Sequence, residues 1–115
     1  MKVHGLFINA QHTLNVPAGA VVFKEGDAGD EMFGVVEGSI RLSVGDREIA
    51  TLGPDDVFGE MAIVDSSPRM ATAVASTDTV LAVIDRKRFL FLVHETPTFA
   101  LSVMSAMANR FRQQS

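Results

Sequence analysis

The chain has 115 residues, a hydrophobic fraction of 47% and a formal net charge of −4. These values indicate one packed domain and exclude both a disordered chain and the basic surface that nucleic acids require. Cysteine is absent, which excludes disulfides and thiolate metal sites. No apolar run exceeds five residues, the length of the run at 89–93, and this is far shorter than a membrane span. No secretory signal is recognisable at the start, so the cytoplasm is the expected location.

From residue 13 onward, short apolar segments separated by turn residues predict an all-β domain. We expect strands at 14–16, 20–23, 32–36, 40–44, 49–52, 71–75 and 80–84, with a hairpin at Gly45-Asp46. The segments 71–75 and 80–84 are expected to pair with each other across residues 76–79. Short strands spaced about eight to twelve residues apart are typical of a closed or rolled β architecture.

Two helices are expected after the last strand. Asp85 is the predicted N-cap of a helix over 86–95, and Thr96-Pro97 is typical of a second helix start. The final helix is predicted to run from residue 97 to about residue 112.

The final helix carries two apolar stripes. One consists of Phe99, Val103 and Met107, and the other, with coiled-coil-like spacing, of Leu101, Met104, Ala108 and Phe111. If the first stripe faces the β domain, the second needs cover from a ligand or from a second subunit. The alternative is a single wide stripe that faces the core.

The candidate ligand site is the segment 58–72, which reads as a short helix, a turn and an arginine. Gly59 lets a ligand approach the backbone, and residues 60–64 offer free N–H groups that favour an anion. Arg69 follows the rigid Pro68 and has a planar donor group that matches two phosphate oxygens. Glu60 would repel a phosphate, so we expect it to accept a hydrogen bond from a sugar hydroxyl. Together these features suggest a nucleotide.

This segment resembles the phosphate-binding cassette of the cyclic nucleotide-binding domain family, which includes catabolite activators, regulatory subunits of cyclic-AMP-dependent kinase and cyclic-nucleotide-gated channels. Residues 58–63 and 68–72 match the cassette, and a second signature lies upstream at Pro17-Ala18-Gly19, Glu25-Gly26-Asp27, Gly29-Asp30, Met32-Phe33 and Gly38. The resemblance covers about residues 12–95. It implies a mainly β fold, a jelly-roll-like β-roll (double-stranded β-helix) with a short cassette helix and two C-terminal helices. We expect a single domain over 1–115, with the roll at about 12–84 and the helices at about 85–113.

The resemblance also implies residue roles. Arg69 would neutralise the cyclic phosphate, Glu60 would bind the ribose 2′-hydroxyl, and Ile63 would contact Phe89 or Leu92 of the following helix. The position after the arginine is usually small in the family, and Met70 offers no hydroxyl there, which favours cyclic AMP over cyclic GMP. The complete predicted ligand-binding set is Gly59, Glu60, Met61, Ala62, Arg69, Met70, Ala71 and Thr72.

Other chemistries have less support. The acidic residues Asp27, Asp30 and Glu31 lack the alternating spacing of an EF-hand, so they are expected to be solvated turn carboxylates. The three histidines, at positions 4, 12 and 94, are too scattered to indicate a metal site. Neither Ser66 nor Ser67 has the surroundings of a catalytic nucleophile.

The sequence therefore predicts a cyclic-nucleotide sensor that signals through its C-terminal helices, with no enzymatic activity, cofactor or catalytic residue. We expect no nucleic-acid or membrane partner. The sequence stops at the final helix, so we expect the output to pass through a homodimer or a partner protein bound to that helix. One alternative is a β-roll that has lost its ligand and serves as a structural or interaction module; another is a β-roll enzyme.

Overall fold

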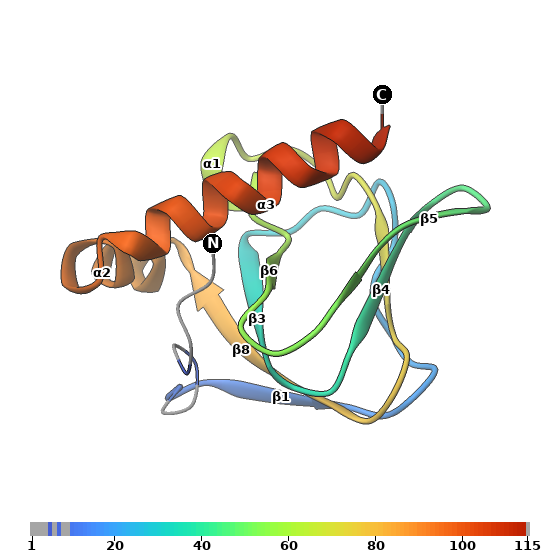
Figure 1. Ribbon diagram of the computed structural model, residues 1–115, viewed down its shortest axis with the longest axis horizontal. Helices are drawn as coiled ribbons and strands as arrows, with labels where there is room; N and C mark the ends of the chain where they lie inside the picture. Colours follow the sequence, from blue (N-terminus) through green and yellow to red (C-terminus); the bar gives the residue numbers. More distant parts are fainter. Residues whose placement is uncertain (1–4, 6, 8–9, 115) are drawn as a thin grey trace.

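The computed structural model describes residues 5, 7 and 10–114. Within these residues, eight strands form two four-stranded antiparallel sheets, in the orders β1-β8-β3-β6 and β2-β7-β4-β5. Figure 1 shows the two sheets enclosing a core, with α3 lying across one end. The strands are β1 Thr13–Val16, β2 Val21–Phe23, β3 Glu31–Glu37, β4 Ile40–Val44, β5 Arg47–Leu52, β6 Val57–Phe58, β7 Thr72–Ala75 and β8 Thr79–Asp85. The predicted mainly β roll is confirmed.

The predicted hairpin at Gly45-Asp46 is present, because β4 pairs antiparallel with β5. The predicted pairing of 71–75 with 80–84 is wrong. Strand β7 pairs with β2 and β4, whereas β8 pairs with β1 and β3 in the other sheet. The segment between them is held by the β3–β4 turn, where the backbone N–H of Ser39 donates to Thr79 Oγ1 at 3.1 Å. Residues 76–79 therefore carry the chain from one sheet to the other.

Strand β6 was not predicted. It has two residues, too few for an alternating pattern to be visible, and it is a strand because Val57 and Phe58 pair with β3. Both side chains are buried, at 3% and 0% exposure. This pairing fixes the backbone directly before the predicted ligand site.

The helices are α1 Met61–Val64, α2 Arg86–Glu95 and α3 Thr98–Gln114. The Asp85 side chain accepts a hydrogen bond from the Arg88 N–H at 2.8 Å, so the predicted N-cap of α2 is confirmed. Among the described helices, none alone is long and apolar enough to cross a membrane; α2 and α3 qualify only as a pair bent by 120°.

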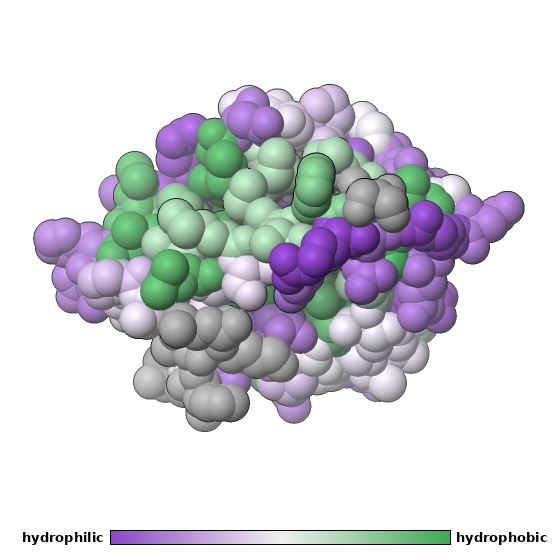
Figure 2. Space-filling model, turned by 45° about the horizontal axis from the view of Figure 1, so that its top comes forward, coloured by the Kyte–Doolittle hydropathy of each residue, from purple (hydrophilic) through white to green (hydrophobic). Residues whose placement is uncertain are grey.

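The two predicted stripes of α3 face different surroundings. Phe99 and Val103 are buried, at 0% and 3% exposure, in a cluster with α1, α2 and the β-roll. Leu101, Met104 and Phe111 are exposed by 48%, 61% and 74%. A single wide core-facing stripe is therefore excluded. Figure 2 shows hydrophobic side chains gathered across this face of the molecule.

Candidate functional site

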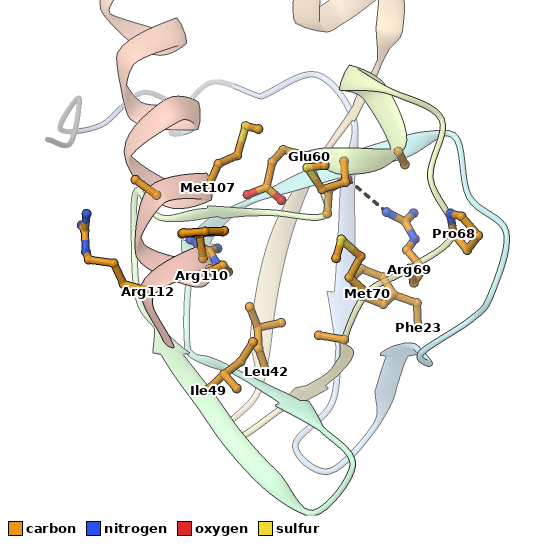
Figure 3. Close-up of a pocket in the computed structure, with 16 residues that line it drawn as sticks. Phe23, Leu42, Ile49, Glu60, Pro68, Arg69, Met70, Met107, Arg110 and Arg112 are labelled. Carbon is orange, nitrogen blue, oxygen red and sulfur yellow. Dashed lines mark hydrogen bonds between the residues drawn. The ribbon is translucent and has the colours of Figure 1, made fainter. Parts of the chain in front are cut away.

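A pocket of about 430 Å³ lies between the cassette, the β-roll and the C-terminal half of α3 (Figure 3). Seven of the predicted site residues line it, namely Gly59, Glu60, Met61, Ala62, Arg69, Met70 and Ala71. The exception is Thr72, which does not line the pocket and whose hydroxyl accepts a hydrogen bond from the Glu25 N–H at 3.1 Å. Thr72 therefore stabilises the turn before β3 in this structure.

Arg69 is held at the pocket by backbone and aromatic contacts. Its backbone N–H donates to the Asp27 carbonyl at 2.8 Å, and its Nη1 donates to the Gly59 carbonyl at 3.2 Å. The guanidinium carbon lies 4.3 Å from the centre of the Phe23 ring, a cation–π contact. The side chain is 9% exposed, and its Nε has no hydrogen-bond partner in the described structure.

The charge on Arg69 is not matched by a direct carboxylate contact from any described residue. Burial lowers the pKa of Arg69, while the acidic residues Glu31, Asp30, Asp27 and Glu60 act in the opposite direction. The guanidinium thus remains positively charged, with carboxylates nearby. At least its Nε–H is still able to donate a hydrogen bond. A bound anion could use that capacity.

Two glycines leave room for the guanidinium. A Cβ at Gly29 would lie 2.4 Å from Arg69 Nη2, and one at Gly59 would lie 2.9 Å from Nη1. Gly59 also has φ +78°, a conformation that L side chains rarely adopt. Gly29 and Gly59 thus leave the space that the guanidinium of Arg69 occupies.

Glu60 is a buried acid that lines the same pocket. It is 6% exposed, and its Oε1 has no hydrogen-bond partner in the described structure. Burial raises the pKa of Glu60, and the main opposing influence is the positive charge of Arg110. A buried acceptor without a donor is costly, and a hydroxyl group in the pocket could supply the missing hydrogen bond to Oε1.

Arg110 was missed by the sequence analysis. It lies on α3, lines the pocket, and donates through Nη1 to the Ala106 carbonyl at 3.0 Å and through Nη2 to the Val57 carbonyl. Burial lowers the pKa of Arg110, and Glu60 and Asp56 oppose that shift. Nothing in the sequence signals this position, because one arginine near the end of an amphipathic helix is ordinarily exposed. Figure 3 shows Arg110 beside the carboxylate of Glu60.

The rest of the wall is mainly apolar. It comes from the β-roll, through Phe23, Leu42 and Ile49, and from α3, through Met107, Ala108 and Phe111. The predicted exposed stripe of α3 is therefore divided, since Ala108 and Phe111 line the pocket but Leu101 and Met104 do not. An anion-binding end and an apolar wall suit a ligand with one charged and one flat, apolar part.

The cassette also contacts α2. Ile63 and Leu92 belong to one buried cluster, and Phe89 packs against that cluster. In addition, Arg86 Nη2 donates to the Ile63 carbonyl at 2.9 Å, where the short helix α1 ends. A shift of α1 would therefore act on α2 through both an apolar and a polar contact.

The geometry does not support a metal site. Among the described residues, no group of three or more His, Asp or Glu is arranged to hold a metal ion. Asp27 has a local role instead, because its Oδ2 accepts from the Lys24 N–H at 3.0 Å.

Comparison with known proteins identifies relatives of this chain. The family model for the cyclic nucleotide-binding domain matches residues 13–96. The chain is 36% identical over 102 residues to the cyclic AMP receptor protein of Thermus thermophilus, covering 84% of the chain and 47% of that protein. It is 40% identical over 84 residues to the cAMP-dependent protein kinase regulatory subunit of Eremothecium gossypii, covering 73% and 18%.

A solved structure has the same fold. The catabolite activator protein of Thermus thermophilus superposes with a TM-score of 0.75 at 33% identity, over 90% of this chain and 51% of that one. The chain thus spans less than half the length of the curated relatives described here. The likeness therefore concerns only a part of each of those proteins.

Proposed function

This chain belongs to the cyclic nucleotide-binding domain family, and we propose that it is a regulatory module that binds cyclic AMP in the pocket beneath α3. Arg69 pairs with the cyclic phosphate, and Glu60 accepts from the ribose 2′-hydroxyl. The purine occupies the apolar part, between the β-roll and the end of α3. The observation that carries the proposal is that Glu60 and Arg69, both nearly buried and both with an unpartnered polar atom, line one pocket.

The charges support a singly charged ligand. Arg69 lies in the cassette segment, and the carboxylates of Asp27, Asp30 and Glu31 already influence it. A cyclic phosphate diester carries one negative charge and two free oxygens, which the guanidinium fork can pair with. An open phosphate monoester carries nearly two charges at neutral pH and meets more repulsion from these carboxylates.

Output in this proposal passes through α2 and α3. Ligand contacts that move α1 act on the Arg86–Ile63 hydrogen bond and on the cluster of Ile63 with Leu92. The end of α3 then closes over the purine through Phe111, while Leu101 and Met104 remain available to a second copy or another protein. In this proposal α3 exchanges between an open and a closed arrangement. The nucleotide shifts that equilibrium only to the extent that it binds one arrangement more tightly than the other.

Isothermal titration calorimetry of the chain with cyclic AMP, cyclic GMP and 5′-AMP tests the proposal. We expect cyclic AMP to bind more tightly than cyclic GMP, and 5′-AMP to bind least tightly. The nucleotide should be recovered chemically unchanged. If neither cyclic nucleotide binds, the chain is a structural or interaction β-roll.

A further inference from the structure

Methionine is unusually placed around this pocket. Met61, Met70 and Met107 all line it. Of the methionines that the structure describes, two are more than half exposed, Met70 at 53% and Met104 at 61%, and Met104 does not line the pocket. Met70 therefore combines high exposure with a position in the ligand site, directly after Arg69. Figure 3 shows it on the same side of the pocket as Arg69.

We propose that Met70 is a modification site, oxidised to the sulfoxide by hydrogen peroxide or a related two-electron oxidant, and that this oxidation lowers the affinity of the pocket for its nucleotide. The inference rests on the proposed function for its effect on binding. The placement of Met70 makes the modification possible without unfolding, because an exposed thioether is open to the oxidant. Met32, at 0% exposure, is protected by the core.

The reaction needs no catalytic group. The thioether sulfur of Met70 supplies two electrons to one peroxide oxygen as the O–O bond breaks. That oxygen becomes the S=O group, and the other leaves as water after taking up the two peroxide hydrogens. Methionine sulfoxide reductases reverse the change.

The consequence follows from the surroundings of the side chain. Leu42 and Ile49, at 3% and 5% exposure, belong to the apolar wall that Met70 shares. A thioether can pack on such a wall and on an aromatic ligand, whereas a sulfoxide is polar and prefers water. Loss of that contact predicts an affinity about two- to tenfold weaker. A nucleotide that packs on the thioether should also slow the oxidation of Met70, because it shields the sulfur from the oxidant.

The test treats the chain with hydrogen peroxide and follows each methionine by peptide mass mapping, with and without saturating cyclic AMP. Calorimetry with cyclic AMP is performed before treatment, after treatment, and after incubation with methionine sulfoxide reductases. Met70→Leu keeps the volume and removes the oxidisable sulfur. Met104→Leu removes the comparably exposed methionine outside the pocket. Each variant is compared with itself before and after peroxide.

We expect Met70 and Met104 to oxidise early, and cyclic AMP to protect Met70 but not Met104. Affinity should fall after peroxide in the wild-type chain and in Met104→Leu, should recover with the reductases, and should stay constant in Met70→Leu.

The inference is overturned if Met70 stays reduced while Met104 oxidises. It is also overturned if Met70→Leu loses as much affinity as the wild type, which would assign the effect to Met61 or Met107. Untreated chain that binds no cyclic nucleotide overturns the proposed function, and this is seen before peroxide is added. Untreated chain that binds, and keeps its affinity after Met70 is oxidised, overturns this inference alone.

Discussion

The guanidinium of Arg69 lies over the ring of Phe23, with 4.3 Å between its central carbon and the ring centroid. This contact replaces a carboxylate partner, so the cation is desolvated and held in place without being neutralised directly. Phe23 itself packs against Phe33 and Phe58, with ring centroids 6.1 and 5.8 Å away. The guanidinium of Arg69 therefore rests on aromatic side chains of the β-roll core, which hold it in position.

Arg69→Ala should weaken cyclic-nucleotide binding by roughly 2–5 kcal/mol, the range for removing one member of a desolvated charge pair. Arg69→Lys should recover only part of the loss, because an ammonium lacks the planar fork. Lys87→Ala, which changes an exposed cation of α2, is the control. Calorimetry that finds equal affinity for Arg69→Ala and Lys87→Ala would place the phosphate elsewhere.

Glu60→Gln should weaken binding by a few kcal/mol at most, about 1–3, because a neutral acceptor replaces a charged one. The loss should be confined to ligands with a 2′-hydroxyl. Affinities of wild type and variant for cyclic AMP and its 2′-deoxy analogue form a double cycle that isolates this contact. Equal discrimination against the deoxy ligand in both proteins would exclude Glu60 as the hydroxyl acceptor.

The raised pKa of Glu60 predicts a pH dependence of ligand affinity. Burial raises this pKa above its ordinary value of 4.5, so the acid takes up its proton before exposed carboxylates do as the pH falls. The ribose hydroxyl donates to the ionised form, and affinity should therefore fall on acidification through that raised pKa. Titrations between neutral and mildly acidic pH should show this fall in the wild type and a flatter profile in Glu60→Gln. Parallel profiles would mean that another group is responsible.

The same shift has a consequence for stability. Because the folded-state pKa of Glu60 is raised, the stabilising form is the protonated one, and its contribution is lost as the pH rises through the folded-state pKa. At neutral pH without ligand, Glu60→Gln should thus unfold at higher denaturant than the wild type. The difference should disappear below the unfolded-state value of about 4.5. A variant that is less stable at neutral pH would indicate that the charge of Glu60 is compensated by Arg110.

Phe111 and Met104 should separate the two roles proposed for α3. Phe111 lines the pocket and is 74% exposed, whereas Met104 lies outside it at 61% exposure. If the helix end closes over the purine, Phe111→Glu should speed ligand dissociation by up to about a hundredfold, the upper limit for burying such a side chain. Stopped-flow measurement of ligand release tests this role.

If Leu101 and Met104 pair with a second copy, Met104→Glu should reduce the mass in light scattering without changing ligand release. The double variant Met104→Glu with Phe111→Glu should show both effects. If neither the mass nor the release rate responds in any of the three variants, this surface of α3 has neither role.

The sequence alone predicted most of what is local in this protein. Turn residues and alternating apolar positions predicted seven of the strands to within about two residues, and Asp85 predicted the start of α2, because such signals act between neighbours in the chain. The candidate ligand site could also be predicted from the sequence, since Gly59, Glu60 and Arg69 lie in one short segment and line one pocket. A contiguous motif can be read directly.

Only the tertiary structure decided what depends on distant segments. Strands β7 and β8 follow each other in sequence yet lie in different sheets, because each finds its hydrogen-bond partners far away in the chain. Glu60 and Arg110 line one pocket only because α3 returns across the β-roll, and Thr72 bonds to Glu25 outside the pocket. Periodicity determines which face of an element is apolar, but the packing of whole elements determines which of those residues line the pocket.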